Sequence, residues 1–300
     1  MSAELVAEAP FAVGYGTNGF ADHRLPEALD VLVELGYRSV ALTLDHHHLD
    51  PFADDLPART ERVRRELDRR GLAVVVETGA RYVLDPFRKH EPTLVGTDGR
   101  SRRVALLRLA LQVARDLGAD AVSFWSGVRP LGCRPEQGTE RLLRSLEQLL
   151  PEAEAAGVRL ALEPEPGHHV GVLQEALDVV ETLGRPAALA LTVDVGHSVC
   201  NEPQPPQETL RLAGDLLANV QLDDMLPGVH EHLPFGEGHV DLPAVLGTLL
   251  ELGYRGPAAV ELPRHSHAAP AVARQSMVAI RNALAEAGSR AQAATAGVPS

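Results

Sequence analysis

The chain of 300 residues has 41 acidic and 28 basic side chains, a formal net charge of -13, and 45% of its residues are hydrophobic. This composition is typical of a globular protein with a full core, and the negative charge argues against nucleic acid as a partner, because phosphate backbones would be repelled. Two cysteines, Cys133 and Cys200, are too few for a disulfide framework. The chain also lacks a leader pattern and any run of roughly 18 apolar residues, so we expect a cytoplasmic protein that does not enter a membrane.

Short β-branched or apolar runs alternate with longer amphipathic stretches, which is the pattern of βα units around a parallel sheet. Eight strands are expected, over residues 12–17, 39–44, 73–78, 121–125, 159–163, 189–194, 219–223 and 258–262. Helical patterns fill the gaps, over residues 25–35, 56–70, 102–117, 136–156, 173–183, 208–213, 242–252 and 271–285. Six of these helices are followed by glycine and then by a strand, which matches the preference of helix ends for a residue that tolerates positive φ.

Eight β-then-α units predict an α/β fold, a closed (β/α)8 TIM barrel that forms a single domain over residues 11–285. A doubly wound open sheet is the alternative, but it would more often show fewer strands and a glycine-rich phosphate turn after the first one. Residues 1–10 and 286–300 are expected to be flexible ends. The second of these segments is rich in Ala, Gly and Ser and lacks an apolar stripe.

All 13 histidines fall in segments predicted to be βα loops, and no predicted helix contains one. In a (β/α)8 barrel these loops and the C-terminal ends of the strands form the active site. The distribution therefore favours a metal site or a proton-transfer site at that face.

The fifth to eighth predicted strands end in side chains that are able to bind a divalent cation. These side chains are Glu163, Asp194, Gln221 and Glu261. Taken singly, each could be a salt-bridge partner or a helix cap. In a barrel, however, the four positions converge, and a cation there would offset the repulsion among three carboxylates. The set therefore favours a metal site.

With these residues the chain resembles the xylose isomerase-like barrels, which include sugar-phosphate isomerases and epimerases, hydroxypyruvate isomerase and, more distantly, endonuclease IV. The resemblance covers most of the chain and is carried by the glutamate of the fifth strand, the DxxH of residues 194–197 and the segment HLPFGEGHVDLPAVLGTLLELGYRGPAAVEL at 232–262. It implies one divalent ion (Mn, Mg, Co or Zn), with His197 and His232 facing the substrate. The implied ligands are Glu163, Asp194, Gln221 and Glu261.

Gln221 stands where the family usually has histidine, although hydroxypyruvate isomerase-like members also carry glutamine there. The change favours oxygen-loving ions. A divalent cation held by a carbonyl and an adjacent hydroxyl oxygen acidifies the C–H between them and stabilises the enediolate. By the family pattern, Glu163 and Glu261 would move the proton. The resemblance thus implies a metal-dependent isomerase or epimerase of a small sugar or hydroxy-carbonyl compound.

Further substrate contacts are expected around this centre. Of His230 and His232 we expect only His232 to face inward, on the reasoning that the two alternate along an extended segment. The loops after the second and third strands place His48, Glu77 and Arg81 above the same face, and the second of these loops is long enough for a lid.

Two expectations about the surrounding side chains remain open. Arg81, Arg88 and Lys89 would bind a phosphate or carboxylate of the substrate, or else form a salt-bridge network with Asp85 and Glu91. The only tryptophan, Trp125, would stack on a sugar face or simply pack in the core.

Two other classes of enzyme use related sites. A multinuclear zinc phosphodiesterase would recruit further histidines, but the net charge and Gln221 argue against it. Those histidines are His46, His48, His197, His230 and His232. A lyase or dehydratase acting on a keto-sugar or cyclitol would need a leaving group β to the acidified carbon. We expect a small sugar-like partner, and the resemblance allows a homo-oligomer.

Overall fold

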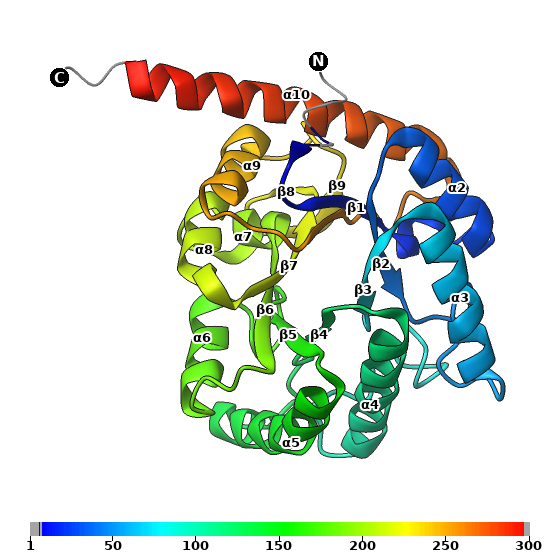
Figure 1. The fold of residues 1–300 in the computed structure, drawn as a ribbon. Coiled ribbons are helices and arrows are strands. Elements are labelled where there is room, and N and C mark those ends of the chain that lie inside the picture. The colour runs from blue at the N-terminus through cyan, green and yellow to red at the C-terminus, as the bar shows by residue number, and fades with distance from the viewer. Residues whose placement is uncertain (1–5, 7, 297–300) are drawn as a thin grey trace.

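The computed structural model describes residues 6 and 8–296 and shows a closed barrel of eight parallel strands surrounded by helices (Figure 1). The barrel strands are β1 (Ala12–Gly16), β2 (Ser39–Thr43), β3 (Ala73–Glu77), β4 (Ala121–Trp125), β5 (Arg159–Glu163), β6 (Leu189–Asp194), β7 (Leu217–Leu222) and β10 (Pro257–Val260). Strand β10 closes the ring by pairing with both β7 and β1. The predicted barrel is confirmed.

The outer layer consists of helices that follow the strands in turn. They are α2 (Leu25–Leu35), α3 (Leu56–Arg70), α4 (Arg100–Leu117), α5 (Pro135–Ala156), α6 (Leu173–Thr182), α8 (Pro206–Ala213), α9 (Leu242–Glu251) and α10 (Ala269–Ala296). Short 3-10 turns are η1 (Thr17–Phe20), η2 (Gly214–Leu216) and η3 (Ser266–Ala268). The glycines expected after six helices all have positive φ, between 61° and 95°, which confirms their role in ending those helices. They are Gly36, Gly71, Gly118, Gly157, Gly184 and Gly253.

Helix α7 (Val195–Asn201) was not predicted and begins directly where β6 ends. The carboxylate of Asp194 accepts the backbone N–H of His197 at 2.8 Å and so caps this helix. The expectation that no helix contains a histidine is therefore wrong, because His197 lies in α7. As a result, Asp194 and His197 are fixed relative to each other by the same turn.

A second unpredicted element is the antiparallel ribbon of β8 (Asp224–Leu226) and β9 (Val229–Leu233), which lies between β7 and α9 in the chain. The buried carboxylate of Asp224 accepts the backbone N–H groups of Gly236, Gly238 and Val240 at 2.8–2.9 Å. A Cβ at Gly238 would lie 2.4 Å from Asp224 Oδ1, so the chain can wrap this closely only with glycine there. One carboxylate thus fastens the segment that follows β9.

The two ends of the chain differ from expectation. Helix α10 continues to Ala296, past the predicted end at Ala285, because alanine favours helix and Arg290 binds Glu286 and Asp241 at 2.7 and 3.0 Å. The predicted flexible tail is therefore helical as far as residue 296, and residues 297–300 lie outside the described residues. Of the N-terminal segment, Val6 is buried in the core, while residues 1–5 and 7 also lie outside the described part. Among the described helices, none has both the length and the apolar character needed to cross a bilayer.

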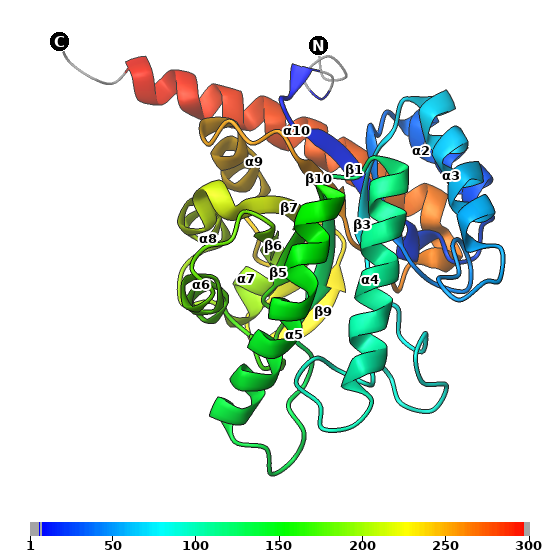
Figure 2. The same cartoon turned by 60° about the horizontal axis from the view of Figure 1, so that its bottom comes forward.

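Inside the barrel the strands change from apolar to polar toward their C-terminal ends. One layer consists of small buried side chains: Ala41, Val75, Ala121, Ala161, Ala190, Ala218 and Ala259. Nearer the C-terminal ends, Thr192 donates to Ser123 at 2.9 Å, and Asn219 donates to Glu77 at 3.0 Å. Figure 2 shows the loops before α4 and α5 projecting together from one end of the molecule. The polar groups therefore collect where βα loops can cover them.

Candidate active site and metal centre

A cavity of about 60 Å³ lies at the C-terminal ends of the strands. Its lining residues are Asn18, Thr43, Glu77, Gly79, Ser123, Trp125, Glu163, Glu165, His197, Gln221, His232 and Glu261. Three of the four predicted ligands are among them. The fourth, Asp194, has a carboxylate oxygen within 4.8 Å of ligand atoms of His232 and Glu261. The structure thus brings all four side chains to one place.

The oxygen atoms at this place fit a divalent cation. Asp194 Oδ2 and Gln221 Oε1 are buried and have no hydrogen-bond partner in the described part of the chain. Burying such oxygens without a partner costs free energy, which coordination to a cation would offset. Carboxylate and amide oxygens are the ligands of hard divalent ions. The residues present therefore fit a metal ion of this kind.

Glu163 and Glu165 form an acidic pair beside these oxygens. Burial raises the pKa of Glu163 well above its ordinary value, and the charge of Glu165 raises it further. Burial also raises the pKa of Glu165 to about 8. Glu165 was not predicted as a site residue, although its position two residues after Glu163 was a usable signal, because residues two apart in an extended segment share a face. Without a cation, this part of the cavity tends to bind protons.

Glu261 lies one residue past β10 and is held from across the barrel seam. Asn18 Nδ2 donates to Glu261 Oε1 at 3.0 Å, although the two residues are 243 positions apart. Burial raises the pKa of Glu261, while the charge of His232 acts against this rise. Sequence analysis missed Asn18, because only closure of the barrel places η1 beside β10.

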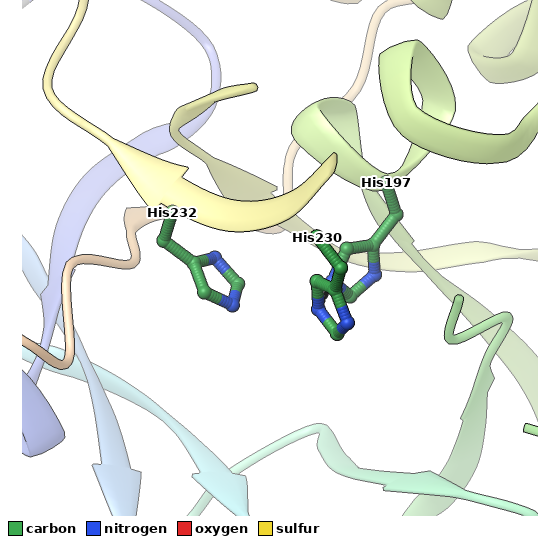
Figure 3. Close-up of side chains that lie close together, drawn as sticks. All are labelled: His197, His230 and His232. Atoms are coloured by element: carbon green, nitrogen blue, oxygen red, sulfur yellow. Dashed lines mark hydrogen bonds between the residues drawn. The ribbon is translucent and has the colours of Figure 1, made fainter. Parts of the chain in front are cut away.

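Three histidines gather at the edge of the cavity, one from α7 and two from β9 (Figure 3). The Nε2 atoms of His197 and His230 lie 3.1 Å apart, and the rings of His197 and His232 are 5.5 Å apart. The expectation that only His232 faces inward is wrong. Residues two apart on a strand point to the same side, so His230 projects with His232.

The environments of these histidines give them opposite charge preferences. His232 Nδ1 lies 2.7 Å from Asp223 Oδ2. Burial acts to lower the pKa of His232, but the charge and hydrogen bond of Asp223 outweigh burial and raise this pKa to about 10. Burial lowers the pKa of His197 well below its ordinary value, and the charge of His232 adds to this effect. A charged imidazole therefore lies beside a neutral one.

The long loop expected after the third strand covers residues 78–99, between β3 and α4, and we call it the lid loop. The buried Arg103 of α4 donates to the backbone carbonyls of Thr78, His90 and Pro92 at 3.3, 2.8 and 3.0 Å. Its guanidinium also lies 4.5 Å from the ring centre of Trp125. One side chain thus ties the two ends of this segment to a helix.

Trp125 is almost fully buried in this arrangement. The rings of His90 and His168 lie 5.1 and 5.0 Å from its ring, and Arg103 lies over it. Packing therefore accounts for most of the indole surface, and only its remaining surface lines the cavity.

Replacement of Arg103 by Met is expected to lower the free energy of unfolding by about 2–4 kcal/mol, because three backbone carbonyls lose a charged donor. Urea unfolding measures this change, and hydrogen exchange in residues 78–92 is expected to become faster. Arg108→Met on the exposed side of the same helix, where Arg108 binds Glu152 at 2.6 Å, is the control. Equal lid exchange in both variants would contradict the anchoring role of Arg103.

Of three other predicted site residues, His48, Glu77 and Arg88, only Glu77 lines the cavity. His48 lines neither this cavity nor the larger one described below, because its Nε2 lies 3.0 Å from the carbonyl of His23. Glu77 lies inside the barrel mouth and lines the cavity. Arg88 binds Asp85 at 2.8 Å, so the salt-bridge alternative is correct for this arginine.

Comparison with known proteins places the chain among sugar-converting enzymes. A curated relative, L-ribulose-5-phosphate 3-epimerase UlaE of Escherichia coli (strain K12), is 27% identical over 229 residues, which cover 74% of this chain and 80% of that protein. A structure described as L-ribulose 3-epimerase superposes with a TM-score of 0.78 at 19% identity and covers 97% of this chain and 100% of its own. The IolI protein with a binding zinc atom superposes with a TM-score of 0.71 at 18% identity, covering 92% and 99% of the two chains.

The names of these relatives support an enzyme of the sugar isomerase and epimerase type. The model of one family, described as xylose isomerase-like TIM barrel, matches residues 29–283. This match includes all four converging side chains at the C-terminal ends of β5, β6, β7 and β10. The chain therefore belongs to the xylose isomerase-like TIM barrel family.

Proposed function

We propose that the protein is a divalent-metal-dependent epimerase or isomerase of a small hydroxy-carbonyl sugar. The observation that carries this proposal is the convergence of Glu163, Asp194, Gln221 and Glu261, with two buried oxygens that lack a hydrogen-bond partner in the described chain. The names of the relatives support sugar chemistry and favour epimerisation over isomerisation.

The four converging side chains would hold the ion. A divalent ion held there supplies Lewis acidity, which polarises the substrate carbonyl and acidifies the neighbouring C–H. The charged His232 is placed to donate a hydrogen bond to a substrate oxygen, because Asp223 keeps it protonated. The neutral His197 can accept or donate one beside it.

Glu163 and Glu261 are the candidates for proton transfer. They lie on β5 and just past β10, which are separated in the barrel by β6 and β7, so they approach the cavity from different sides. Burial raises the pKa of both, so each can hold a proton nearer neutral pH than an exposed glutamate does. Removal of a proton by one glutamate and donation of a proton by the other to the opposite face of the same carbon gives epimerisation. Donation to the former carbonyl carbon, with a hydroxyl proton moving between the two oxygens, gives isomerisation.

The same residues would also serve a lyase if the substrate carried a leaving group β to the acidified carbon. The gathering of His197, His230 and His232 favours a different second candidate, a multinuclear zinc phosphodiesterase. Gln221, in place of a zinc-favouring histidine, and the formal net charge of -13 argue against that role.

Metal analysis and proton exchange together test the proposed function. Elemental mass spectrometry of the purified, untagged protein is expected to find about one divalent ion per chain, as one set of four ligands implies. In D₂O, NMR is expected to show deuterium entering a ketose substrate at the carbon beside the carbonyl. Two or three zinc ions would favour the phosphodiesterase, and failure to bind metal after reconstitution would overturn the proposal.

A further inference from the structure

A larger cavity of about 450 Å³ continues from the candidate metal centre to the inner side of the lid. Its floor includes His232 and Glu261, which it shares with the smaller cavity. Its lining also includes Arg81 and Lys89, both from the lid loop. One continuous space is therefore lined both by Glu261 of the metal centre and by two cationic side chains of the lid loop.

Arg81 and Lys89 have no direct acidic partner in the described part of the chain. Within residues 6 and 8–296, neither side chain makes an ion pair or a hydrogen bond, although acidic side chains outnumber basic ones by 41 to 28. Arg88, the immediate neighbour of Lys89, shows the usual arrangement, since it donates two hydrogen bonds to Asp85 at 2.9 and 2.8 Å. Of the three cationic side chains in the lid loop, Arg88 thus binds within the loop, whereas Arg81 and Lys89 line the cavity.

Lys89 also stands out in the amino-acid composition of the chain. It is the only lysine in the sequence, so every other basic side chain among the 28 is arginine. An ammonium group is a compact charge that can turn toward any oxygen, whereas guanidinium binds two oxygens in a fixed plane. A lysine beside an arginine can therefore contact several oxygens of one phosphate.

We propose that the substrate carries a phosphate at the end remote from its reacting carbonyl, and that Arg81 and Lys89 bind this phosphate. This inference rests on the proposed function, because that function assigns the reacting end to the metal centre. A phosphate has a charge of about -1.5 to -2 at neutral pH, which two cations match, whereas a carboxylate would leave one cation unbalanced. The carboxylates of the metal centre repel phosphate, which favours the substrate orientation that places the phosphate on Arg81 and Lys89.

Calorimetric titration of the metal-loaded protein with L-ribulose 5-phosphate and with L-ribulose tests this assignment. The phosphorylated sugar is expected to bind at least about tenfold more tightly, and Arg81→Met and Lys89→Met are each expected to weaken its binding about tenfold, since each removes a charged hydrogen bond. Binding of the free sugar is expected to change less than about twofold in both variants. Arg88→Met, which alters the same loop but a neutralised cation, is the matched control and is expected to leave both affinities unchanged.

Chemical labelling provides a second measurement that needs no variant. Because Lys89 is the only lysine, an amine-acylating reagent can modify only one ε-amino group, and peptide mass spectrometry reads its extent. L-Ribulose 5-phosphate is expected to protect Lys89, whereas L-ribulose is expected not to. Equal protection by both sugars would overturn the assignment.

Other outcomes separate this inference from the proposed function. Equal affinity for both sugars, equal losses in the Arg81, Lys89 and Arg88 variants, or tighter binding of a ketose with a terminal carboxylate would each overturn the phosphate assignment. Phosphate-dependent binding that is lost in the Arg81 and Lys89 variants, but without any deuterium exchange, would support the phosphate site and contradict the proposed reaction. Deuterium exchange at the same rate in L-ribulose 5-phosphate and in L-ribulose would support the reaction and contradict the phosphate site.

Discussion

Glu163→Gln and Glu261→Gln are each expected to slow interconversion of the substrate by about 10²- to 10⁴-fold, the range that general acid–base catalysis contributes. Glutamine preserves the shape of the side chain but cannot take up and release the proton. NMR in D₂O measures both the conversion and the entry of deuterium at the carbon beside the carbonyl. Conversion at the wild-type rate in either variant would remove that residue from proton transfer.

Metal content must be measured on the same samples, because both glutamates are also expected ligands. Gln221 is itself an expected amide ligand, so a glutamine at position 163 or 261 still offers an oxygen to the ion. Loss of conversion with the metal retained would assign the residue to proton transfer, whereas loss of both would assign it to metal binding. Glu202→Gln is a suitable control, since Glu202 accepts a backbone hydrogen bond from Leu173 and lies outside the larger cavity and the metal centre.

Asp194→Asn is expected to remove nearly all of the bound metal. Asp194 Oδ1 caps α7, and asparagine caps helices equally well, so the fold is preserved. Oδ2, which has no hydrogen-bond partner in the described residues, is lost as an acceptor if the amide nitrogen occupies its place, and an N–H group repels a cation. Elemental mass spectrometry is expected to find less than about a tenth of the wild-type metal, consistent with loss of a central charged ligand.

Metal is expected to stabilise the wild type much more than this variant. With a chelator present, the variant should match or exceed the wild type, because one repelling carboxylate is gone. At metal concentrations 100-fold above the dissociation constant, the wild type gains about 2.7 kcal/mol and the variant gains little. Asp241→Asn is the matched control, because Asp241 caps α9 through Ala244 at 3.1 Å and lies away from the metal centre. Equal stabilisation of the wild type and Asp194→Asn by metal would contradict the role of Asp194.

The barrel could be predicted because its signals are local. Each strand is a short apolar run, and six helices end at a glycine with positive φ, so the boundaries follow from neighbouring residues alone. Helix α7 was missed because it starts at the residue directly after β6, without an intervening loop. The extension of α10 was missed because an alanine-rich segment shows no apolar stripe, and its ion pair from Arg290 to Asp241 spans 49 positions.

The site could be predicted only in part, because only some of its residues are marked by local sequence signals. Glu163, Asp194, Gln221 and Glu261 lie at or near the C-terminal ends of predicted strands, and the barrel rule places such positions together. Asn18 contacts Glu261 only after the barrel closes, and His48 turns away because a loop has no periodicity that fixes its side chains. Local sequence thus identifies which residues reach the mouth of the barrel, but not how loops from distant units meet there.

The ribbon of β8 and β9 has an evolutionary consequence. His230 and His232 lie on a ribbon outside the barrel sheet, and Asp224 of this ribbon fastens the segment that follows it, while the expected metal ligands belong to the barrel strands and their ends. Most of residues 229–233 can therefore vary without disturbing the barrel strands, whereas His232 is tied to the buried Asp223. A lineage could acquire new reactions by exchanging this ribbon alone, and a library restricted to these positions would explore different chemistry on one unchanged scaffold.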